Sequence, residues 1–236
     1  TSAVQGAELA IRNANKNGDL NNRQFELVVR SMEGPWGTGS KQAVNLIFEE
    51  KVWALLGCHD GRNAHLVEQA ATKSTVVFVS AWAGDPTLSQ AFVPWFFNCV
   101  PNALQQSSAL IEEIYNKRKI SKVAIVSDSD YDSKQSLNNF LGEIKQKKKA
   151  DPILFMYENY SANLNDMLNR IDLDGVNCII LFCKPFASNK IFKLIRQRKM
   201  NQPVFGSLYL SSENELSDIE FRHYDNSLVV PSAIWS

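Results

Sequence analysis

A polar turn at residues 58–63 carries residue types suited to binding an anion. It reads Cys58-His59-Asp60-Gly61-Arg62-Asn63 and precedes a stretch with helical spacing. Gly61 before a helix leaves backbone N–H groups open to a negatively charged group. Arg62 can add a bidentate contact to a carboxylate, although a solvated arginine at a helix start is an equally good interpretation.

A second polar turn follows the apolar run at residues 76–79. Its residues are candidates for ligand contact: Ser80, Ala81, Trp82, Ala83 and Gly84. Trp82 can form an aromatic wall of a binding site, and the alternative is that it packs between two lobes. Later in the chain, Tyr131 and Lys184 each come shortly after an apolar strand-like run, so both are further candidates.

No signature of catalysis or cofactor binding accompanies these turns. The sequence lacks a GxGxxG loop, a Walker A loop and a GxSxG elbow. His59 and His65 have no third metal ligand nearby in the sequence. We therefore expect a binding protein rather than an enzyme, with no cofactor and no metal.

The composition limits the classes of partner that the protein can bind. Lys plus Arg equals Asp plus Glu, at 25 each, so there is no net basic field for nucleic acid. The basic run at 145–149 closes a predicted helix, where cations complement the helix dipole. The four cysteines have no CxxC spacing and are interpreted as small buried hydrophobes. No apolar run is long enough to cross a bilayer.

Helical and strand-like segments alternate along the chain, which is typical of parallel sheets with helices on both faces. Strands are predicted at 25–29, 52–56, 76–79, 95–100, 123–126, 153–157, 178–182, 203–205 and 227–230. A Gly- and Pro-rich loop is predicted at 34–39. The alternation pauses before residue 101, which predicts two α/β lobes, at 1–100 and 101–236. Ligands of such sheets bind beyond the carboxyl ends of the strands. This rule selects the loops near Trp36 and at 59–63, 80–85, 128–131, 184–186 and 207–209.

The first predicted helix has no strand before it, and nothing follows the last strand to return to the first lobe. We therefore expect that segments are missing at both ends. No signal peptide opens the chain, so either the protein is cytoplasmic or a signal peptide was removed.

The order of several segments resembles that of type I periplasmic solute-binding proteins of the branched-chain amino-acid class. The resemblance begins with GAELAIRNANKNGDLNNRQFELVVRS and covers essentially the whole chain, through KQAVNLIFEEKVWALLG, VVFVSAWAGDPTLS, FFNCVPNALQQSSALIEEI and KVAIVSDSDYDSKQS. It implies two Rossmann-like lobes with a ligand cleft between them. It also implies delivery of an amino-acid-like or carboxylate-bearing solute to an ABC transporter permease. The location would be the periplasm or the outside of the cell, with the protein either free or held by a lipid anchor. A monomer or weak dimer is expected. A receptor ectodomain that senses ligand is the alternative.

The resemblance also implies a site. The turn at 80–84 stands where the family has Ser-Pro-Ala-Ala-Thr, so Trp82 and Gly84 depart from the pattern. Tyr131 matches a second-lobe tyrosine and Lys184 an aromatic position. Leu208, with Tyr209 beside it, replaces the acidic residue that holds a ligand ammonium in the family.

Overall fold

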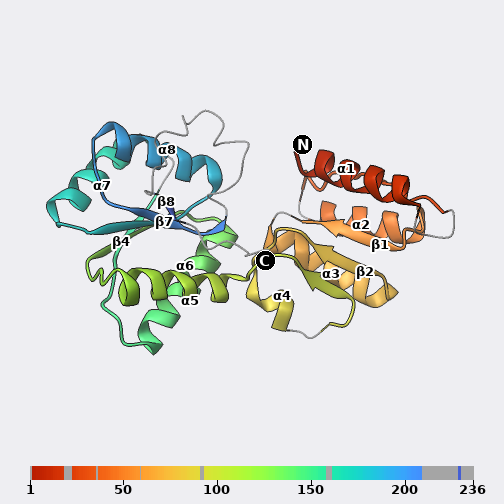
Figure 1. The fold of residues 1–236 in the computed structure, drawn as a ribbon, viewed down its shortest axis with the longest axis horizontal. Coiled ribbons are helices and arrows are strands. Elements are labelled where there is room, and N and C mark those ends of the chain that lie inside the picture. The colour runs from red at the N-terminus through yellow and green to blue at the C-terminus, as the bar shows by residue number, and fades with distance from the viewer. Residues whose placement is uncertain are drawn as a thin grey trace.

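The computed structural model describes residues 2–18, 23–35, 37–58, 60–90, 93–157, 161–208 and 228–229. Trp36, His59 and Tyr209 lie outside these residues. Figure 1 shows the described chain as two α/β lobes side by side, each with a parallel sheet. The predicted α/β fold is confirmed.

The second lobe is a five-stranded parallel sheet in the order β5-β4-β6-β7-β8. Its strands are β4 (Val123–Ser127), β5 (Ile153–Met156), β6 (Cys178–Phe182), β7 (Val204–Gly206) and β8 (Leu228–Val229). Its helices are α5 (Ala103–Ile111), continued by a π-helical turn η1 (Glu112–Lys117), α6 (Tyr131–Gln146), α7 (Ser161–Leu173) and α8 (Pro185–Gln197). In Figure 1, α7 and α8 cover one face of this sheet and α5 and α6 the other.

The central strands of this lobe are apolar throughout because both of their faces are covered. All residues of β4 and β6 are buried. Alternate side chains serve different cores: Ala124 and Val126 pack with α7 and α8, whereas Val123 and Ile125 pack with α5 and α6. This alternation follows from the two-residue period of a strand and explains why these strands were predictable from apolar runs.

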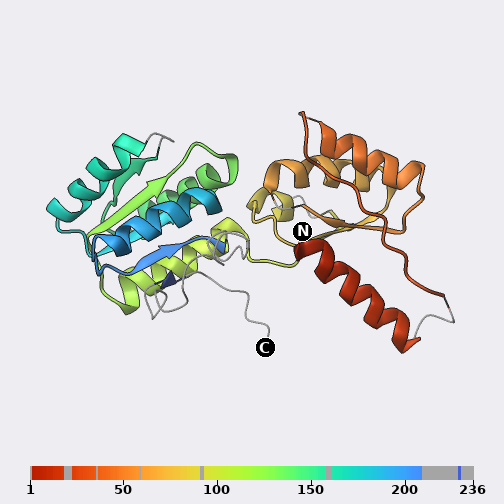
Figure 2. The ribbon, with the colours of Figure 1, turned by 90° about the horizontal axis from the view of Figure 1, so that it is seen from above.

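The first lobe holds a three-stranded parallel sheet in the order β1-β2-β3. Its strands are β1 (Ala54–Gly57), β2 (Val77–Ser80) and β3 (Phe96–Asn98), and its helices are α1 (Ser2–Asn17), α2 (Thr38–Phe48), α3 (Gly61–Ser74) and α4 (Pro86–Gln90). Figure 2 shows α1 on one side of the sheet and α2 and α3 on the other. The core lies on the α2 and α3 side, with Leu55 and Phe78 at its centre.

The strand predicted at 25–29 is wrong. Residues 23–33 are described and contain no strand. The backbone N–H and C=O of Phe25 bond to the side chain of Asn15 instead of to a neighbouring strand, and Phe25 and Val29 are 49% and 48% exposed. A strand-forming sequence needs a lateral partner to become a strand, and this segment pairs with none. The loop predicted at 34–39 is also too long, since α2 begins at Thr38.

The other predicted strands are present, each shifted by at most two residues. The basic run at 145–149 spans the end of α6, as predicted, with Lys145 in the last turn of the helix. The two sheets share no strand in the part of the chain that the structure describes, and we propose that the lobe boundary lies near residue 100, between β3 and α5. None of the helices, within the described ranges, is long and apolar enough to cross a membrane.

Candidate functional site

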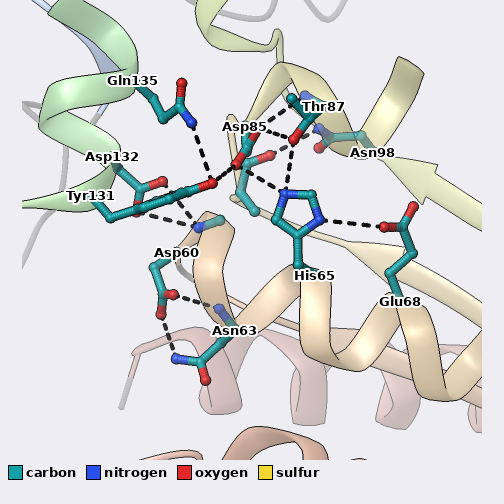
Figure 3. Close-up of polar contacts among 12 residues, drawn as sticks. Asp60, Asn63, His65, Glu68, Asp85, Thr87, Asn98, Tyr131, Asp132 and Gln135 are labelled. Atoms are coloured by element: carbon teal, nitrogen blue, oxygen red, sulfur yellow. Dashed lines mark hydrogen bonds and ion pairs between the residues drawn. The ribbon is translucent and has the colours of Figure 1, made fainter. Parts of the chain in front are cut away.

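The lobes meet at a buried carboxylate, Asp85, which lies just after the turn that follows β2. Its side chain is fully buried and collects hydrogen-bond donors from both lobes (Figure 3). From the first lobe, Thr87 donates its backbone N–H at 2.9 Å and its hydroxyl at 2.6 Å to Oδ1. From the second lobe, the hydroxyl of Tyr131 donates to Oδ2 at 2.7 Å.

The protonation of Asp85 reflects these donors. Burial alone would raise the pKa of Asp85, but the hydrogen bonds from Thr87 and Tyr131, with His65 nearby, outweigh burial and hold that pKa below its usual value. Burial, and then the hydrogen bond to Asp85, raises the pKa of the Tyr131 phenol. Asp85 is therefore an ionised acceptor and Tyr131 a neutral donor at neutral pH.

A second carboxylate crosses the lobe interface in the opposite direction. Asp132, in the first turn of α6, accepts the backbone N–H of Gly61 at 3.0 Å through Oδ1 and 3.3 Å through Oδ2. Gly61 is the first residue of α3, so its N–H is one of the helix-start donors predicted to meet an anion. The anion that they meet in the structure is a side chain of the other lobe.

His65 and Glu68 extend the cluster along α3. The Nε2 atom of His65 lies 3.1 Å from Oδ2 of Asp85 and 2.9 Å from the hydroxyl of Thr87. Its Nδ1 atom lies 3.7 Å from Oε2 of Glu68. Burial raises the pKa of Glu68, the proximity of His65 opposes this, and Oε1 of Glu68 is buried without a hydrogen-bond partner.

Local sequence fixes the two helix starts that face each other. Asp60 caps α3 by accepting the N–H of Asn63 at 2.8 Å, and Asp130 caps α6 by accepting the N–H of Asp132. Asp and Asn are favoured at such positions because their side chains replace a missing backbone acceptor. Gly61 is needed for close approach: a methyl group there would lie 2.7 Å from Cβ of Asp85 and 2.9 Å from Oδ1 of Asp132.

Of the residues predicted for the site, three gather at this interface. Gly61 and Tyr131 are joined to Asp132 and Asp85 as described, and the guanidinium of Arg62 lies 5.5 Å from the centre of the Tyr131 ring. That distance allows a cation–π contact. The interpretation of Arg62 as a purely solvated side chain is therefore incomplete, although the residue is exposed.

The turn at 80–84 lines the first-lobe side. Ser80 is fully buried and its hydroxyl accepts the N–H of Ala83 at 3.3 Å. Ala83 is buried, Ala81 is exposed and Trp82 is half-buried. Gly84 accepts the N–H of Ala103 at 2.6 Å through its carbonyl, which ties this turn to the start of α5.

Lys184 lies farther out, at the residue before α8. Its side chain is 63% exposed and its Nζ atom lies 2.8 Å from Oδ1 of Asp130. That hydrogen bond raises the pKa of Lys184. Asp128 accepts the backbone N–H of Lys184 at 2.7 Å. Tyr209, also predicted for the site, lies outside the described residues.

Sequence reasoning missed Asp85, Asp132 and His65 as functional residues. Asp85 ends a loop that the strand-end rule selects, and Asp132 directly follows the predicted Tyr131, so both positions could be found from the sequence. Their hydrogen-bond partners could not, because Asp132 accepts the N–H of a residue 71 positions earlier in the chain.

A small cavity adjoins the interface, lined by residues of both lobes including Asp85, Asp132 and Gln135. It has room for roughly one water molecule. Gln106 spans part of it and accepts the N–H of Leu208 at 3.0 Å through its side-chain oxygen. This cavity, formed by described residues, is too small for an amino acid.

A protein-family model described as the receptor family ligand binding region matches residues 3–230. Solved structures of the same fold include a substrate-binding protein of an ABC transporter from Desulfitobacterium hafniense in complex with Leu. It is 15% identical, with a TM-score of 0.74, and the match covers 88% of this chain and 62% of that one.

Two further structures are similar. The branched-chain amino acid transporter substrate-binding protein LivJ from Streptococcus pneumoniae, in complex with isoleucine, is 19% identical with a TM-score of 0.71, over 86% of this chain and 57% of that one. A solute-binding protein of an ABC transporter from Rhodopseudomonas palustris, in complex with 3,4-dihydroxy benzoic acid, is 17% identical with a TM-score of 0.69, over 87% and 57%. This chain thus spans about three fifths of their length, and at these identities the likeness shows the fold.

Proposed function

Because this chain belongs to the protein family described as the receptor family ligand binding region, whose model matches residues 3–230, we propose that it is an extracytoplasmic solute-binding protein. Its solute is a small amino-acid-like or other carboxylate-bearing molecule, held between the lobes and delivered to an ABC importer. The substrate-binding proteins that share its fold, one with bound Leu and one with isoleucine, support this class of function. The role is binding without catalysis.

The observation that carries the proposal is a donor and an acceptor placed side by side between the lobes. The N–H of Gly61 is held by a carboxylate, and the adjacent carboxylate of Asp85 is held by a hydroxyl donor. Asp85 is so near Gly61 that a methyl group at residue 61 would contact both Cβ and Oδ2 of Asp85. An α-amino acid presents a carboxylate and an ammonium at a similarly short separation.

In this proposal most of the predicted residues have a role when the lobes separate and close on a solute. Gly61 and Arg62 receive the solute carboxylate, through helix-start N–H groups and a guanidinium. Asp85 receives the ammonium. Tyr131 and Trp82 form aromatic walls, and the backbone around Ala83 and Gly84 shapes the first-lobe side. Lys184 is placed at the outer edge.

Calorimetric titration with matched solutes tests the assignment. L-leucine has both charged groups, 4-methylpentanoate keeps only the carboxylate, and 3-methylbutylamine keeps only the amine. We expect binding of the amino acid or of another solute with a carboxylate in a wider panel of amino acids and aromatic acids. The amine alone is expected to bind at least tenfold more weakly, since one charge-assisted hydrogen bond contributes about 1.5–3 kcal/mol. If the amine binds as well as L-leucine, or no carboxylate-bearing solute binds, the proposal is wrong.

A receptor ectodomain that senses such a solute is the second candidate, and the description of the matching family favours it. The two candidates share the site and differ in the partner. A transmembrane segment and an output domain in the complete reading frame would support sensing, whereas a neighbouring permease gene would support transport.

A further inference from the structure

The second lobe itself fills both halves of the site proposed above. The carboxylate of Asp132 accepts the Gly61 N–H, and the hydroxyl of Tyr131 donates to the carboxylate of Asp85. We propose that Asp132 and Tyr131 form a latch that stands in for the solute, Asp132 for its carboxylate and Tyr131 for its ammonium. The latch holds the lobes together, and a solute must displace it. This inference rests on the proposed function for its meaning and on the lobe contacts for its geometry.

Asp132 is well placed to act as an internal anion. It lies in the first turn of α6 and bonds to the first residue of α3, so its charge sits between the positive ends of two helix dipoles. The residue is 6% exposed, which leaves little water to compete with the Gly61 N–H. Figure 3 shows Asp132 and Tyr131 extending together from α6 toward α3 and Asp85.

The Tyr131 half of the latch is also a strong contact. The acceptor is an ionised, fully buried carboxylate and the bond is 2.7 Å long, within the range of charge-assisted hydrogen bonds. Gln135 donates to the same hydroxyl at 3.3 Å, which orients the phenol so that its proton points to Asp85.

A latch of this kind sets solute affinity as well as lobe closure. A molecule whose site is filled by its own side chains cannot bind solute. The apparent association constant is therefore the intrinsic one multiplied by the fraction of molecules that are not latched. Removing the Asp132 carboxylate therefore has two measurable effects. The lobes separate more often, and a solute binds more tightly.

The test measures lobe separation directly, in protein to which no solute has been added. Spin labels introduced through unnatural amino acids at the exposed positions Gln69 on α3 and Asn138 on α6 report the distance between lobes by electron–electron double resonance. In Asp132→Ala we expect the ratio of separated to closed molecules to rise roughly ten- to a hundredfold. Asp132→Asn keeps an oxygen acceptor without the charge and should give a smaller rise.

The control is Asp166→Ala, which removes an exposed carboxylate from α7 in the same lobe and should leave the distance distribution unchanged. Tyr131→Phe keeps the ring and removes only the hydroxyl, so it tests the latch even if Asp132→Ala folds poorly. An unchanged distribution in both Asp132→Asn and Tyr131→Phe would overturn the latch.

Titration of the same variants with L-leucine separates this inference from the proposed function. Wider separation without binding of L-leucine or of any other solute in the panel supports the latch and refutes the proposed function. Binding of a solute with no change in lobe distance refutes the latch and leaves the proposed function standing.

Discussion

Gly61→Ala is the substitution for which the structure predicts the most specific result. The new methyl group would lie 2.7 Å from Cβ of Asp85, 2.9 Å from Oδ1 of Asp132 and 3.0 Å from Oδ2 of Asp85. The Asp132 carboxylate can swing away because it ends a side chain. The Cβ atom of Asp85 is fixed to its backbone and cannot, so the first lobe has to deform.

The size of the effect follows from three contributions. Overpacking of this kind costs about 1–3 kcal/mol, and loss of the charged hydrogen bond from the Gly61 N–H costs about 1.5–3 kcal/mol. The two overlap because moving Asp132 relieves part of the clash. Alanine in place of glycine returns about 0.5–1 kcal/mol in the middle of a helix and less at the first residue, where Gly61 lies. We expect a net loss of about 2 kcal/mol in the free energy of unfolding.

Urea denaturation followed by circular dichroism measures this loss, and Gly142→Ala is its matched control. Gly142 lies within α6, and a methyl group there meets nothing within 4 Å, so that variant should gain about 0.5–1 kcal/mol. In an Asp132→Ala background the cost of Gly61→Ala should shrink but persist, because the contact with Asp85 remains. A Gly61→Ala protein as stable as the Gly142→Ala control would refute the described geometry.

The remaining predictions concern single side chains. Phe140→Ala should lower the free energy of unfolding by about 3–5 kcal/mol in urea denaturation, because Phe140 is fully buried and packs edge-on against Phe182. Glu68→Gln should be stabilising at pH 7, with a gain that shrinks towards pH 4: burial raises the pKa of Glu68 above 4.5, so the folded wild type gains stability as it takes up this proton. Melting temperatures of both proteins across this range test the sign, and a gap that widens on acidification would contradict it. Burial raises the pKa of Cys58 to about 12, so iodoacetamide at pH 8 should modify Cys58 only after unfolding, as peptide mass spectrometry would show. Lys184→Ala should change stability by less than about 1 kcal/mol, because its ion pair with Asp130 is solvent-exposed.

The strands of the second lobe were predictable because burial acts on each of them locally. A strand covered on both faces must be apolar along its whole length, and this leaves runs such as that of β6, which begins and ends where the sequence predicts. The segment at 25–29 is also rich in apolar residues that favour strands, and it forms no strand. Composition reports a preference for extended backbone, whereas a strand also requires a neighbour, and no local pattern reveals whether the neighbour is present.

The site, too, has features that local sequence predicts and features that it does not. Helix starts and strand ends can be located from local signals, and these placed Gly61 and Tyr131 at facing edges. Which acceptor bonds to the Gly61 N–H depends on how two helix starts from different lobes come together, and this is a property of the assembled fold.

The facing helix starts also explain why a turn without serine hydroxyls still forms an anion site. The resemblance places Gly84 where the family has a threonine, and the turn that contains Gly61 has no serine or threonine. In the structure the helix-start N–H of Gly61 binds a carboxylate without any hydroxyl, and the close approach of Asp85 is possible because residue 61 lacks a side chain. Gly61 therefore donates its N–H to a carboxylate and lets the carboxylate of Asp85 lie beside it. A glycine at residue 61 thus places a hydrogen-bond donor and a carboxylate acceptor side by side, as the proposed site for an amino-acid-like solute requires.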